Sequence, residues 1–98
     1  MLDIYTVAFF GHRYIDNPLK IEELLEEQIR KLIDENEYVE FLVGNNGDFD
    51  RCVSSAVLRV RKNYRDDNSS LVLMLPYATA EYLNNEESFN EYYTDVEI

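Results

Sequence analysis

The feature that most constrains this chain is the repeated alternation of short apolar runs with longer stretches of helical periodicity. Residues 5–10 (YTVAFF), 38–43 (YVEFLV) and 71–75 (LVLML) are rich in β-branched, aromatic and aliphatic side chains, as strands are. Between these runs, apolar residues recur at the spacing of an amphipathic helix. Strands that alternate with helices indicate a parallel sheet with right-handed crossovers. We therefore predict an α/β fold: a Rossmann-like, three-layer α/β/α domain with a small, mainly parallel sheet of three or four strands.

Local signals place the boundaries of these elements. Asn17 and Pro18 predict a helix start, because Asn caps free amides and Pro at the first position has no amide hydrogen to leave unpaired. This helix ends near Asn36. Asp48 is expected to cap a second helix, and Cys52 lies on its apolar face. The run 5–10 shows no alternation and is predicted to be a strand buried on both faces, and 71–75 is predicted to be another buried strand. We expect residues 77–85 to be irregular or a short helix, 86–93 to be a helix, and 96–98 to begin a fourth strand or to fray.

The charge of the chain excludes several classes of partner. Nine Lys plus Arg and twenty Asp plus Glu give its 98 residues a net charge of −11. This surface repels phosphate backbones and anionic lipid, so we predict neither duplex nucleic acid nor a membrane as partner. The length accommodates one domain over 1–98, which is either complete or the N-terminal part of a longer domain.

The residue inventory also bears on metals and on the compartment. One cysteine cannot form an internal disulfide, which fits a reducing cytoplasm. One Cys and one His cannot build a zinc site of the usual kind, so we predict no metal. The apolar runs are much shorter than the roughly 20 residues of a membrane-spanning helix.

The predicted site lies where the strands end. Ligands of open α/β sheets bind outside the carboxyl ends of the strands, and here three turns follow the strand runs. Glycine allows the backbone to approach a ligand closely, and the start of the second helix directs free amides and a positive dipole end at the same place. We therefore predict an anion, such as a phosphate, as ligand. The candidate ligand-binding residues are Gly11, His12, Arg13, Gly44, Asn45, Asn46, Gly47, Asp50, Pro76 and Tyr77.

Three motifs resemble a known superfamily: TVAFFGHR at 6–13, LVGNNGDFDRCVSSAV at 42–57 and LVLMLPY at 71–77. In this order they are similar to the SLOG superfamily, the Rossmann-like group that contains the DNA-processing protein DprA (Smf) and the "lonely guy" cytokinin-activating enzymes. The nearest match is a subgroup of small bacterial proteins with a Gly-His-Arg motif after the first strand, here Gly11, His12 and Arg13. The resemblance covers most of residues 6–98.

The resemblance implies a nucleotide-like ligand held at the strand-end turns. In the enzymatic branch it also implies hydrolysis of an N-glycosidic bond. That branch carries a later PGGxGTxxE motif, which supplies a phosphate cradle and a catalytic glutamate and is absent from this chain. We therefore predict a binding or sensing domain for a nucleotide-like or phosphate-bearing small ligand, with no catalytic residues and no cofactor.

Simpler interpretations remain open. Arg13 could pair with the acidic first helix, His12 could cap its turn, and the glycines could serve turn geometry alone. The alternative function is a ligand-free interaction module. Its opposed acidic and basic helices and its open sheet edge would pair with another chain, and we predict self-association. A weaker alternative is an N-glycosidic nucleotide hydrolase.

Overall fold

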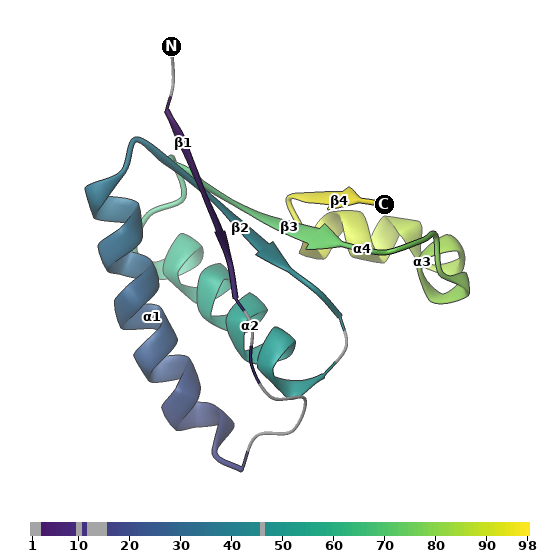
Figure 1. Cartoon of the computed structure of the whole chain (residues 1–98), viewed down its shortest axis with the longest axis horizontal. Helices are drawn as coiled ribbons and strands as arrows, with labels where there is room; N and C mark the ends of the chain where they lie inside the picture. The colour runs from purple at the N-terminus through teal and green to yellow at the C-terminus, as the bar shows by residue number, and fades with distance from the viewer. Residues whose placement is uncertain (1–2, 10, 12–15, 46) are drawn as a thin grey trace.

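The structure is a computed structural model that describes residues 3–9, 11, 16–45 and 47–98. Strands and helices alternate through the first three strands, and two short helices precede the last strand (Figure 1). In chain order the elements are β1 (Ile4–Ala8), α1 (Pro18–Glu35), β2 (Tyr38–Val43), α2 (Asp48–Asn63), β3 (Ser69–Met74), α3 (Ala80–Asn84), α4 (Glu86–Tyr92) and β4 (Asp95–Glu97).

The four strands form one sheet in the order β1-β2-β3-β4, and every neighbouring pair is parallel. Thr6 pairs with Glu40, and Glu40 pairs with Ser70, so the register runs straight across the first three strands. The predicted α/β class and the small parallel, Rossmann-like sheet packed with helices are confirmed. The strand order, which the sequence left open, is the order of the chain.

Helices α1 and α2 pack against each other on one face of this sheet (Figure 1). Each right-handed crossover moves one strand further in the same direction, so both helices lie on the same side. The core between the two layers contains Ile29 from α1, Val53 from α2, and Phe41 and Leu71 from the strands, all with 0% exposure. Burial of each such side chain stabilises the fold by roughly 1.5–3 kcal/mol.

The strands differ in how their second face is covered. Burial alternates along β2, where Val39, Phe41 and Val43 are buried and their neighbours are only partly buried. In β1 every residue except the partly buried Val7 is exposed, so the prediction that this run is buried on both faces is wrong. β1 is an edge strand, and the described helices α1 and α2 cover one side of it only. By contrast β3 is buried from Ser69 to Leu73, so the run 71–75 is buried as predicted except at Met74, which is 40% exposed.

The starts of the two long helices test the capping predictions. The Asn17 side chain accepts a hydrogen bond from the Lys20 amide at 3.4 Å, and α1 begins at Pro18 as predicted. At α2 the N-cap is Gly47, which is extended and offers no side-chain cap, so the prediction that Asp48 is the cap is wrong. Asp48 instead lies in the first turn, where its carboxylate interacts favourably with the helix dipole.

Oppositely charged side chains join α1 to α2. Glu22 is 8% exposed, and its carboxylate lies 3.0 Å from the Arg59 guanidinium, which also lies 3.9 Å from Glu26. The acidic and basic helices of the sequence analysis therefore pair with each other within the chain. This pairing removes one reason for expecting the same faces to bind a second copy.

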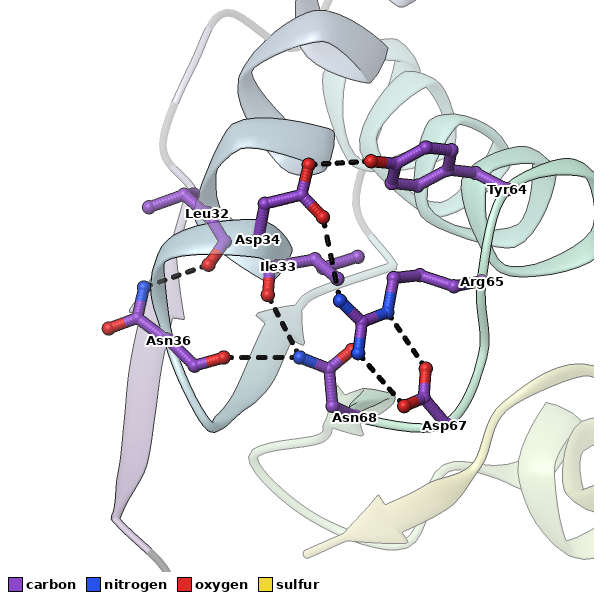
Figure 2. Close-up of polar contacts among 8 residues, drawn as sticks. All are labelled: Leu32, Ile33, Asp34, Asn36, Tyr64, Arg65, Asp67 and Asn68. Carbon is purple, nitrogen blue, oxygen red and sulfur yellow. Dashed lines mark hydrogen bonds and ion pairs between the residues drawn. The ribbon is translucent and has the colours of Figure 1, made fainter.

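A polar junction holds the end of α1 to the segment between α2 and β3 (Figure 2). The Asn68 side-chain amide donates to the backbone oxygens of Ile33 and Asn36, at 2.8 and 3.1 Å. Arg65 makes a two-point contact with the Asp67 carboxylate, with both N–O distances 2.8 Å, and this contact lowers the pKa of Asp67. Asn68 thus supplies donors to carbonyls at a helix end, where backbone partners run out.

The C-terminal segment, from residue 77 onward, contains two short helices and the last strand. Residues 80–84 and 86–92 are helices, and β4 adds to β3 through hydrogen bonds such as that from the Leu75 amide to the Glu97 carbonyl at 2.8 Å. Phe89 packs edge-on against Tyr82 and in a stacked arrangement against Tyr93. Across the described residues, no helix is both long and apolar enough to cross a membrane.

Candidate functional site

The carboxyl ends of β1, β2 and β3 meet at one edge of the sheet, because the three strands are parallel and in register. The loops that carry the predicted site leave from this edge. His12, Arg13 and Asn46 lie outside the described residues. The structure describes the other seven candidates. They lie in different surroundings: against a packed side chain, at the start of a helix, in the wall of a cavity, or in exposed loops.

Gly11 lies against the start of α2. A Cβ atom added to Gly11 would come within 2.5 Å of Cγ of the Phe49 ring, closer than real Cβ atoms approach other atoms. Gly11, in the loop after β1, therefore meets the first turn of α2. A side chain fills this meeting point, so packing against Phe49 explains the glycine without a ligand.

The first turn of α2 combines free amides with carboxylates. Gly47 provides no side-chain cap, and Asp48 and Asp50 both lie in the first turn. The Asp48 carboxylate is 3.7 Å from the Arg51 guanidinium. These carboxylates already occupy the positive end of the helix dipole, which makes the turn less favourable for a phosphate than the glycines alone suggested.

Asp50 also lies near a partly buried tyrosine, Tyr93, from the other end of the chain. Burial raises the pKa of Tyr93, and the negative charge of Asp50 adds to this shift, whereas a hydrogen bond with Ser54 opposes it. Tyr93 packs against the core cluster beside α2. The hydroxyl of Tyr93 therefore has a structural partner in Ser54.

A cavity of about 300 Å³ lies at the same edge of the sheet. Its walls are apolar apart from backbone atoms. They come from the last residues of three strands and from the residues that directly follow β1 and β2: Ala8, Phe9, Leu42, Val43, Gly44 and Met74. Of the predicted site residues that the structure describes, only Gly44 contributes to it. The volume is at the lower end of the range for small-ligand sites, and the lining suits an apolar side chain or a flat ring better than an anion.

The remaining candidates lie apart from this cavity. Asn45 and Pro76 are exposed, and Tyr77 is 65% exposed. None of these three side chains lines the cavity. The strand order adds a reason: a ligand crevice forms where the order of parallel strands reverses, and the order β1-β2-β3-β4 has no reversal.

The cavity is continuous with a larger surface that sequence reasoning missed. Successive strand residues point to opposite faces, so the residues that alternate with the core positions Val39, Phe41 and Val43 face away from α1 and α2. We call this surface the open sheet face and define it by Ile4, Thr6, Ala8, Glu40, Leu42 and Met74.

Apolar side chains dominate the open sheet face. Ile4 is 57% exposed and Met74 is 40% exposed. Glu40 is partly buried at its centre, and no described residue forms a hydrogen bond or ion pair with its carboxylate. The signal in the sequence was this one charge inside the run YVEFLV, which contradicts a strand buried on both faces.

Comparisons with known proteins do not extend these observations. No family model matches the chain, and no curated protein and no solved structure matches it either. The similarity to the SLOG superfamily stays a prediction. Within the described part of the chain, no group of three or more His, Cys, Asp or Glu side chains is arranged to hold a metal ion.

Proposed function

We propose that this chain is a protein-interaction module that binds a partner through the open sheet face. The observation that carries the proposal is an uncovered face on a parallel sheet, where Ile4 is exposed at the start of β1 and Met74 is exposed at the end of β3, beside an apolar cavity of about 300 Å³. Parallel sheets are almost always covered on both faces, so exposed apolar side chains on this face mark a site of association. A partner that covers β1 and β2 would provide the missing contacts, with one apolar side chain in the cavity.

A neutral probe tests this proposal without help from charge. The probe is a model helix with Leu along one face and Gln elsewhere, titrated into the labelled protein while backbone amide NMR signals are followed. We expect the largest shifts at Thr6, Ala8 and Leu42. Met74→Gln should weaken binding about tenfold, because loss of buried apolar surface at a cavity wall removes about 1–2 kcal/mol.

Leu24→Gln provides the matched control. Leu24 is 53% exposed on α1, so the substitution has the same chemistry on the other layer of the domain. Affinity for the probe should stay within twofold. Equal losses for Leu24→Gln and Met74→Gln, or amide shifts concentrated on α1, would count against the open sheet face as the binding surface.

A second candidate function is the binding of a nucleotide-like ligand. We infer that a nucleotide-like molecule could place its base in the cavity, with its phosphate near the start of α2, which has no side-chain cap. The position of Gly44 in the cavity wall supports this candidate, because the turn that begins at Gly44 leads directly to the start of α2. Thermal unfolding with millimolar nucleoside monophosphates tests it: an increase in Tm that Arg13→Ala abolishes supports it, and no increase counts against it.

A further inference from the structure

We propose that the segment bound by the open sheet face is a basic amphipathic helix, and this rests on the proposed interaction function. Its apolar side chains would cover β1 and β2, and a Lys or Arg would pair with Glu40.

The dimensions fit one helix. The five residues of β1 and six of β2 extend roughly 16–20 Å at about 3.3 Å per residue. A helix of about 12 residues has the same length, at 1.5 Å per residue. Its diameter of about 10 Å spans two strands that lie about 4.8 Å apart. A single helix of about three turns would therefore cover these two strands, as α1 and α2 cover the other face.

Within the four strands, the charge on this side of the sheet has one sign. Glu40 lies at the centre of the open sheet face, flanked in register by Thr6 and Ser70. Asp95 and Glu97 of β4 are exposed and pair in register with Val72 and Met74, so they belong to the same side. None of the four strands contains a Lys or Arg. A partner that approaches this face meets carboxylates with no compensating cation in the sheet.

The position of Glu40 gives this charge a specific role. The carboxylate is partly buried and lacks a partner among the described residues. A helix laid over β1 and β2 would remove it further from water, and burial of an unpaired carboxylate is strongly unfavourable. A Lys or Arg on the helix would compensate for that loss of hydration, whereas a neutral or acidic side chain would not.

A second copy of this chain fits the face poorly. The described basic side chains that form ion pairs, such as Arg59 and Arg65, lie on the helical layer and contact the chain's own carboxylates. Two open sheet faces in contact would bring Glu40 toward Glu40, in molecules that each carry a net charge of −11. Like charges across an interface disfavour association, so the observations point to a basic partner.

Three model helices with the same Leu face test the inference. Their polar faces carry Lys, Gln or Glu, and their affinities are measured by fluorescence anisotropy at 0.15 M salt with the intact chain. We expect the Lys helix to bind at least tenfold more tightly than the Gln helix, and the Glu helix to bind most weakly. Glu40→Gln should weaken the Lys helix about fivefold and leave the Gln helix unchanged.

Glu27→Gln is the matched control, because Glu27 is exposed on α1 and its substitution changes the net charge by the same amount as Glu40→Gln. It should alter affinity for the Lys helix less than twofold. Equal effects of Glu27→Gln and Glu40→Gln would mean general attraction to an acidic protein and would overturn the inference. Urea unfolding of both variants confirms that they remain folded.

The outcomes separate this inference from the proposed function. If the Gln and Lys helices bind equally at the open sheet face, the basic partner is wrong and the interaction function stands. If none of the three helices binds there, both are wrong. If sedimentation shows a dimer that Met74→Gln dissociates, the face serves a second copy, and the inference of a basic partner is overturned.

Discussion

Replacing Asn68 with Asp should remove the polar junction that fixes the end of α1. The side chain keeps its shape, but both of its donor hydrogens are lost. The backbone oxygens of Ile33 and Asn36 then lose their partner, and a carboxylate replaces an amide that is 6% exposed (Figure 2). Asn68 also supplies the backbone oxygen that accepts from the Val39 amide, so its position affects the start of β2.

The size of the effect follows from those two bonds. The contact with Ile33 is buried, and loss of a buried partner costs about 1–3 kcal/mol, whereas the part-buried contact with Asn36 contributes about 1 kcal/mol. The sum is about 2–4 kcal/mol, a large fraction of the roughly 5–15 kcal/mol by which domains are stable. With an m-value of about 1.5 kcal/mol per M urea, the unfolding midpoint should fall by about 2 M.

Urea unfolding followed by circular dichroism measures this change directly. Asn85→Asp is the control: the Asn85 side-chain amide donates to the Glu81 oxygen at 2.8 Å, but at an exposed site. Its midpoint should fall by less than about a third as much, because water replaces the lost donor. A midpoint for Asn68→Asp within 0.3 M of the original chain, on the order of the effect of a neutral surface change, would refute the assignment of Asn68 as the structural support of this junction.

Three further predictions follow from buried contacts. Gly11→Ala should destabilise the fold by about 1–3 kcal/mol, because the added methyl group overlaps the Phe49 ring. In a double-mutant cycle measured by urea midpoints, Phe49→Leu should recover part of this loss, and strictly additive effects would argue against the contact. Arg59→Met should lower the free energy of unfolding by about 1–3 kcal/mol, because it leaves the buried Glu22 carboxylate unpaired. In thermal unfolding, the additional substitution Glu22→Gln should reverse most of this loss, and no recovery would contradict the pairing. Burial raises the pKa of Tyr93 in the folded chain, so the folded state holds this proton more tightly, and stability should be lost as pH rises above about 10. Urea midpoints between pH 8 and 11 should fall less steeply for Tyr93→Phe, with the exposed Tyr77→Phe as control, and equal slopes would exclude Tyr93 as the cause.

Local sequence was sufficient for the elements that depend on local interactions. The start of α1 follows from Asn17 and Pro18, because capping and proline geometry involve only neighbouring residues. The alternation of strands and helices likewise follows from hydrophobic periodicity, which is why the α/β class and the parallel sheet are as predicted. The cap of α2 escaped prediction because Gly47 and Asp48 are both acceptable at that position, and the choice depends on how the preceding loop packs.

The candidate site shows the limit of local reasoning most clearly. A glycine in a turn predicts that a ligand or another part of the chain approaches the backbone closely. Only the fold shows that the neighbour of Gly11 is the Phe49 ring. The cavity at the sheet edge is lined by Ala8, Leu42 and Met74, which come from three strands and carry no motif.

The open sheet face, too, was decided by tertiary structure. Glu40 in the run 38–43 indicates a strand with one buried face, but the pattern of side chains does not encode strand order and so does not show whether a helix of the same chain covers the other face. Order β1-β2-β3-β4 moves every crossover in one direction, which places α1 and α2 together on one layer. Glu40 and Met74 therefore face solvent on the other side, and the function proposed for this chain depends on that arrangement.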